Sequence, residues 1–150
     1  MRDRPRMVGA AARPVKAAFA LVLLAGCFWR SYGPQVATHT EVLLGIARKG
    51  ADLVGGGRLT AESMPELTYP LERAAAFAAK ARSRAGDAPP ASLVALETLI
   101  ARYRDFVDAL DRARRDHEPR DARDRLGAPL AAVEAAGEGV REALRSEGRL

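Results

Sequence analysis

The chain has 150 residues and a net charge of +5, but its first 26 residues hold five of the 24 Lys and Arg residues and only one of the 19 Asp and Glu residues. The remaining 19 basic and 18 acidic residues nearly cancel, which excludes the strong positive field of a nucleic-acid-binding domain. A single cysteine excludes a disulfide within the chain, so the fold must rely on its apolar core.

An uncharged apolar stretch follows Arg13 and Lys16 and runs from Ala17 to Ala25. These nine residues match the hydrophobic region of a signal peptide, which has about 7–15 residues. The thirteen uncharged residues up to Trp29 fall short of the roughly 20 that a membrane-spanning helix needs. Residues 1–26 are therefore predicted to be an export signal that starts at Met1 or Met7.

The apolar stretch closes on the sequence Leu24-Ala25-Gly26-Cys27, and Cys27 is the lone cysteine. This sequence resembles the lipobox of bacterial lipoprotein precursors, and the resemblance covers residues 13–27 only. It implies cleavage after Gly26, a diacylglyceryl group on the Cys27 sulfur and an acyl chain such as palmitate on the new amino terminus. Phe28, rather than Asp, follows the cysteine, which by the same resemblance implies the outer membrane, with the domain facing the periplasm or the cell surface.

The segment 28–38 contains Gly33 and Pro34 and shows no apolar periodicity, so residues 27–39 are predicted to be a lipidated cysteine and its tether. The folded domain is expected to span residues 40–150. Its first helix is predicted over 40–53, with Thr40 as the N-cap and Glu41 favourably placed at the helix dipole. The apolar spacing of this helix is Leu43, Ile46, Ala47, Gly50 and Val54, and Gly55-Gly56-Gly57 should end it.

The second predicted helix starts near Pro70, where a proline costs least, and ends near Ala85. A short helical turn over 60–67 is expected before it, with Ser63 and Glu66 in capping-box spacing. Small residues should let this helix approach its neighbours closely. Its predicted inner face consists of Leu71, Ala74, Ala75, Phe77, Ala78 and Ala81.

The third helix, over 91–115, has the strongest apolar periodicity of the chain, with spacings of three and four residues. Its stripe contains Leu93, Leu96, Ile100, Tyr103, Val107 and Leu110, widened by Leu99 and Phe106. The fourth helix has the same type of stripe, formed by Leu126, Leu130, Val133, Gly137, Val140 and Leu144. Pro129 should kink it or mark its effective start, and Gly137 on the stripe suggests close contact between helices.

No segment has the alternation of a strand, so the sequence predicts an all-α fold: a small antiparallel four-helix bundle with up-down-up-down topology. Charges of alternating sign over 111–125, with Pro119 among them, predict a solvated turn between the last two helices. The residues of the mature domain do not resemble those of any protein family that can be named.

Chemistry-bearing residues are few. The two histidines, His39 and His117, fall in predicted loops and lack the spacing of metal ligands. A non-covalent haem would need Met64 with one of them, and Met64 is more simply a packing residue. No nucleophile has a base near it in the sequence, and Gly55-Gly56-Gly57 lacks the Lys and Ser or Thr of a phosphate loop.

These observations favour a lipid-anchored envelope protein whose bundle is a non-enzymatic interaction module for an unknown protein partner. The expected membrane attachment is Cys27, and no catalytic residue, metal, cofactor or nucleic acid is predicted. The alternative is a bundle of the periplasm that binds a small ligand or a metal between its helices. Tyr103, the one polar residue on a core stripe, is the feature that keeps this alternative open.

Overall fold

A computed structural model describes residues 14–115 and 119–150, and every regular element within these ranges is helical. The elements are α1 (Pro14–Gly55), the 3₁₀ turn η1 (Ala61–Ser63), α2 (Met64–Ala85), α3 (Ala91–Arg115) and α4 (Pro119–Ser146). Two structural units divide the chain, Met1–Tyr32 and Gly33–Leu150, and the second contains the bundle. The predicted all-α four-helix bundle is confirmed.

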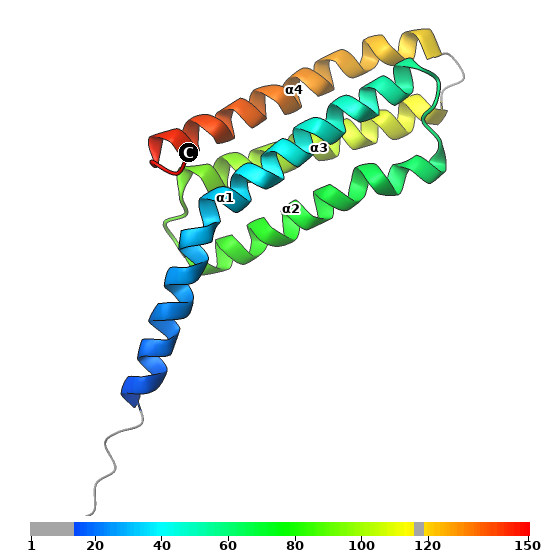
Figure 1. Cartoon of the computed structure of the whole chain (residues 1–150). Helices are drawn as coiled ribbons and strands as arrows, with labels where there is room; N and C mark the ends of the chain where they lie inside the picture. Colours follow the sequence, from blue (N-terminus) through cyan, green and yellow to red (C-terminus); the bar gives the residue numbers. More distant parts are fainter. Residues whose placement is uncertain (1–13, 116–118) are drawn as a thin grey trace, which may run out of the picture. The chain divides into compact units, whose positions relative to one another are not determined.

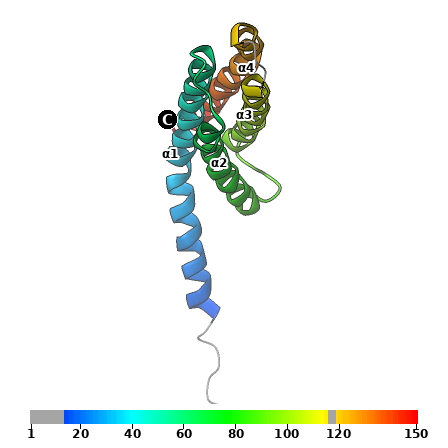
Figure 2. The same ribbon diagram turned by 90° about the vertical axis from the view of Figure 1, so that its right-hand side faces the viewer.

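The helices of the second unit alternate in direction along the sequence, which gives the predicted up-down-up-down topology (Figure 1). Figure 2 shows them around one core, with α1 and α3 on opposite sides of it. One end of the bundle is closed by a contact between the start of α3 and the end of α4. There the Glu147 carboxylate accepts hydrogen bonds from the Ser92 backbone N–H (2.8 Å) and the Ser92 hydroxyl (2.7 Å). This places a negative charge where the α3 dipole favours it.

The apolar stripes predict the core well. All eight residues of the predicted α3 stripe are buried. On α4 the stripe is buried except for Leu130, which is half-buried. On α2 the buried face consists of Leu67, Ala74, Phe77, Ala78 and Ala81, while Leu71 and Ala75 of the predicted face are half-buried. The buried residues that α1 contributes from the second unit are Gly33, Val36, Thr40, Leu43, Leu44, Ala47, Gly50 and Val54, and Ile46 of the predicted stripe is half-buried.

The predicted tether is the main error of the sequence analysis, because residues 28–39 are helical and belong to α1. Thr40 is not an N-cap: its hydroxyl donates to the Val36 carbonyl (2.9 Å), and the Thr38 hydroxyl donates to the Pro34 carbonyl (2.8 Å). Such bonds let threonine sit inside a helix. Gly33 is buried, and a Cβ there would lie 3.0 Å from Arg149 Cβ, so this glycine marks close packing rather than a break.

The start of α2 also differs from the prediction. The helix begins at Met64, so Pro65 and not the predicted Pro70 lies in the first turn, and Pro70 lies inside the helix. Ser63 makes no capping hydrogen bond, so the predicted capping box is absent. Its hydroxyl lies 3.1 Å from that of Thr60, and Glu66 instead pairs with Lys49 of α1 at 2.9 Å. The Glu66 side chain is thus engaged in an ion pair with another helix instead of in the predicted capping box.

Pro129 likewise lies inside α4, which starts ten residues earlier at Pro119, so Pro129 does not mark the start of the helix. Ion pairs link neighbouring helices along the bundle. Arg141 of α4 pairs with Glu41 of α1 (2.7 Å), and Arg48 of α1 pairs with Glu134 of α4 (2.9 Å). These side chains are partly exposed, so each pair contributes about 0–1 kcal/mol. Their main effect is to favour one register between α1 and α4.

Two glycines mark close contacts of α1 with the rest of the bundle. A Cβ on Gly137 of α4 would lie 2.8 Å from both terminal methyl carbons of Leu44 and 3.1 Å from its Cγ. A Cβ on Gly50 of α1 would lie 2.9 Å from Leu110 Cδ1 of α3. The close helix contact that Gly137 suggested in the sequence is therefore present, and Leu44 fills the space above this glycine.

The two glycines of α4 give a direct test of this packing. Gly139 is exposed with no atom near its would-be Cβ, so Gly139→Ala should stabilise the fold by up to about 1 kcal/mol through helix propensity. Gly137→Ala gains the same propensity but displaces the buried Leu44, and overpacking costs about 1–3 kcal/mol. We expect a net loss of stability, measured by urea unfolding of residues 28–150 followed by circular dichroism. Equal stabilisation by both substitutions would contradict the close contact.

Candidate functional site

Tyr103, the polar residue on the α3 stripe, has a structural role. Its ring is fully buried, and its hydroxyl donates a hydrogen bond of 2.8 Å to the Leu67 carbonyl at the start of α2. Burial raises the pKa of this hydroxyl, so it stays protonated and remains a donor. The Tyr103 side chain therefore joins α3 to α2. This hydrogen bond explains why the apolar stripe of α3 contains a tyrosine.

The other buried polar residues are also engaged. Thr40 donates within α1, and Ser92 donates to Glu147. Across the described ranges, no buried side-chain nitrogen or oxygen atom lacks a hydrogen-bond partner. A ligand site inside a bundle usually presents a few convergent polar groups. The described interior has no spare polar group of this kind.

His39 lies within α1 rather than in the predicted loop. It is half-buried, and its ring centroid is 5.0 Å from that of Phe77 on α2. Burial lowers the pKa of His39 below its ordinary value, and the positive charge of Arg73 lowers it further. The imidazole is thus held neutral at pH 7, as a ring packed between two helices.

His117 lies outside the described residues, and Met64 is half-buried at the first position of α2. Phe77, which contacts His39, is thirteen residues further along α2, or about 20 Å along the helix axis. His39 and Met64 therefore cannot bind one haem iron. Among the side chains that the structure describes, no three of His, Cys, Asp or Glu are grouped to hold a metal ion.

The triple glycine ends α1, as predicted. Gly57 has a φ of +63°, which glycine adopts without strain. The amides that follow the helix donate back to its last turns: Gly56 to the Asp52 carbonyl (3.0 Å), Gly57 to Val54 (3.0 Å) and Arg58 to Leu53 (2.8 Å). These N–H groups satisfy the helix terminus and so are not directed at a phosphate.

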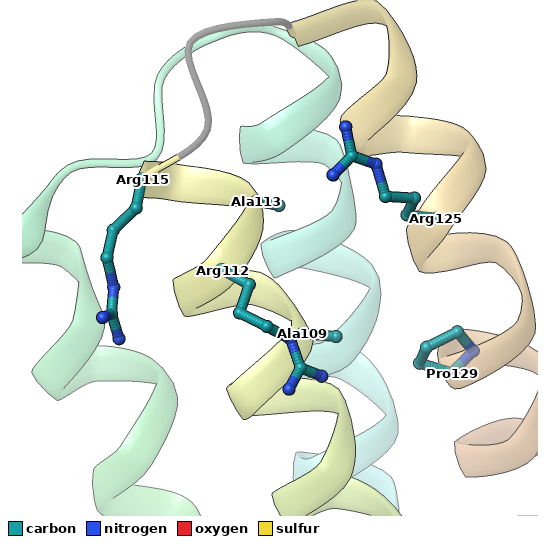
Figure 3. A pocket seen from close by; sticks show the side chains of 6 residues that line it. All are labelled: Ala109, Arg112, Ala113, Arg115, Arg125 and Pro129. Atoms are coloured by element: carbon teal, nitrogen blue, oxygen red, sulfur yellow. The ribbon is translucent and has the colours of Figure 1, made fainter.

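A surface groove between the last turns of α3 and the first turns of α4 is lined by three arginines (Figure 3). Its volume is about 440 Å³, and its lining residues are Ala109, Arg112, Ala113, Arg115, Arg125 and Pro129. Two alanines and two arginines line the groove from α3, while Arg125 and Pro129 line it from α4. A second groove of about 290 Å³ between α1 and α4 has a mainly apolar lining with one charged residue, Asp52.

The arginines of the first groove differ in their partners. Arg115 and Arg114 both donate to Asp111, and these hydrogen bonds hold the pKa of Asp111 below its ordinary value. Arg112 is exposed and makes no ion pair with a described residue. We call the site lined by these six residues the arginine groove; Arg112 is its exposed arginine without an ion pair among the described residues. From the sequence, the Arg-rich stretch 111–125 could meet lipid headgroups or an acidic polymer, but its five carboxylates favour a solvated turn of mixed charge.

Cys27, the predicted lipidation residue, lies within α1. Directly after it, three aromatic residues occupy positions 28, 29 and 32, and we call Phe28, Trp29 and Tyr32 the aromatic turn. Trp29 lies 5.3 Å from Phe28 in an edge-to-face contact and 5.0 Å from Tyr32, measured between ring centroids. The chain has only eight aromatic residues, so three within five positions is a signal that the sequence analysis missed.

None of the described helices combines the length and the apolar character needed to cross a membrane. Comparison of the chain with protein-family models, with curated proteins and with solved structures found no match. The function must therefore be argued from the residues and their geometry.

Proposed function

We propose that this chain is a bacterial lipoprotein whose helical bundle is a non-enzymatic interaction module held at a membrane by Cys27. The observation that carries the proposal is the order of features along the sequence: a basic flank, a nine-residue apolar stretch, then Leu24-Ala25-Gly26-Cys27. Each is what export and lipidation require at that place. Since a lipoprotein terminus has more than one acyl chain, it would hold the domain stably at a bilayer.

The distance from the anchor to the bundle supports a role close to the membrane. The structural unit that contains the bundle starts at Gly33, six residues after Cys27. Even a fully extended chain of six residues spans at most about 22 Å. A partner of the bundle must therefore either reside at the membrane surface or come to it.

Two further observations favour partner binding over catalysis or the binding of a small ligand between the helices. The described interior has no unsatisfied polar side chain, whereas the arginine groove places exposed cationic groups beside apolar alanines at the surface. Arginine beside apolar surface is typical of protein interfaces. The partner that this groove fits is a protein with an acidic segment.

The proposed location follows from the same sequence features. Export places the bundle outside the cytoplasm, and Phe28 after Cys27 favours the outer membrane over the inner membrane by analogy with lipoprotein sorting. The bundle would then face the periplasm or the cell surface.

Substitution of Cys27 tests the anchor. Cys27→Ser removes the only thiol while leaving the apolar stretch intact, so export should continue but lipidation should stop. Cells given a fatty-acid analogue should label the wild-type chain and not the variant.

A matched control uses Ser31, which is exposed one helical turn later. The double variant Cys27→Ser, Ser31→Cys restores a thiol outside the lipobox and should remain unlabelled. Labelling of the single variant at the wild-type level would refute the lipoprotein proposal.

The interaction role is tested by site-specific photo-crosslinking in cells. A photoreactive residue in place of Arg112 should give one discrete adduct, identified by mass spectrometry, and Arg125→Glu in the same chain should abolish it. The same residue in place of Lys80, which is exposed on α2 away from the groove, should give none. Absence of any adduct at Arg112, or equal adducts at both positions, would contradict a partner at the arginine groove.

A further inference from the structure

The aromatic turn follows directly on the residue that the proposed function assigns to lipidation. Phe28 and Tyr32 are four residues apart and Trp29 and Tyr32 are three apart, so their side chains share one side of the helix. The ring contacts confirm this arrangement, with centroids 5.0–6.2 Å apart. The three rings thus form one cluster within α1, directly after the proposed anchor residue.

Burial differs within the cluster. Tyr32 is fully buried, whereas Phe28 and Trp29 are half-buried. Arg30, the next residue, is exposed. Two partly accessible aromatic rings beside an exposed guanidinium are the chemistry of the bilayer interface, where amphipathic rings lie at the level of the headgroups and cations meet phosphates.

The dimensions agree with this environment. The interfacial layer on each side of a bilayer is about 5–8 Å thick. This is half the difference between the total thickness of the bilayer and the thickness of its hydrocarbon core. A helix rises about 1.5 Å per residue, so positions 28–32 extend roughly 2–8 Å from Cys27 along the axis. If the acyl chains of Cys27 enter the bilayer, the aromatic turn is therefore close enough to Cys27 to lie within the headgroup layer.

We infer that Phe28 and Trp29 bind the lipid interface directly and form a second attachment beside the acylated Cys27. The inference rests on the proposed lipidation. A lipid surface is favoured over a protein partner because the cluster is continuous in sequence with the anchor, and because the nearest exposed charge, Arg30, is cationic. The aromatic turn would hold this part of α1 at the membrane surface instead of leaving it free to rotate about the acyl chains.

Trp29 is the only tryptophan of the chain, so its emission reports this position without a label. The experiment uses the lipidated chain purified from membranes and reconstituted into phosphatidylcholine–phosphatidylglycerol vesicles. A fraction of the lipid is brominated near the headgroup end of the acyl chains, and bromine quenches tryptophan at short range. We expect the brominated vesicles to remove most of the Trp29 emission, while aqueous iodide has little effect.

A relocated reporter is the matched control. The double variant Trp29→Phe, Tyr69→Trp places the tryptophan at an exposed position of α2. This reporter should be quenched by iodide and not by the brominated lipid. Quenching by brominated lipid at both positions would overturn the assignment of the contact to the aromatic turn.

Mass spectrometry of the same sample separates the two proposals. If Cys27 carries no acyl groups, the proposed function fails. If Cys27 is acylated but Trp29 is quenched by iodide and spared by brominated lipid, the lipoprotein proposal stands and the interfacial role of the aromatic turn is wrong.

Discussion

The packing of the bundle depends on how closely α1 approaches the other helices. Leu44 of α1 fills the space above Gly137 of α4, and Leu110 of α3 fills the space above Gly50 of α1. A Cβ at either glycine would come within 3.0 Å of a leucine methyl carbon, so this leucine would have to shift. The ion pair between Arg141 and Glu41 adds a polar contact along the same α1–α4 seam. Packing of this kind admits little sliding, because interior contacts are as dense as those of organic crystals.

The packing of α1 also determines at which residue the folded domain begins. Gly33 and Val36 are buried, so the bundle uses residues that the sequence pattern assigns to a tether. The proposed anchor at Cys27 and the start of the bundle are then only six residues apart. A module with so short a connection to its proposed anchor would stay near the membrane surface and could not reach across the envelope. This is the physical basis for expecting a membrane-associated partner at the arginine groove.

The sequence predicted what apolar periodicity controls. The bounds of α3, its eight-residue stripe and the close contact at Gly137 followed from residue spacing. The errors lie where long-range contacts override local signals. Gly33 and Pro34 have the composition of a break, yet Gly33 packs against Arg149, which is distant in sequence. Ser63 and Glu66 have capping-box spacing, yet Glu66 pairs with Lys49. The arginine groove needs two helices to be placed side by side, and His39 needs Phe77 from another helix, so neither could be located from spacing alone.

The central claim is that the folded domain starts at Gly33, immediately beyond the proposed anchor. Hydrogen exchange of the full lipidated chain in vesicles, read by mass spectrometry, measures this directly, because exchange of helical amides requires local opening. The amides of residues 36–40 should exchange as slowly as those of 43–47 within the same helix. Exchange at 36–40 as fast as in an unstructured peptide, with protection beginning only after Thr40, would show that this segment is a flexible tether and would contradict the account.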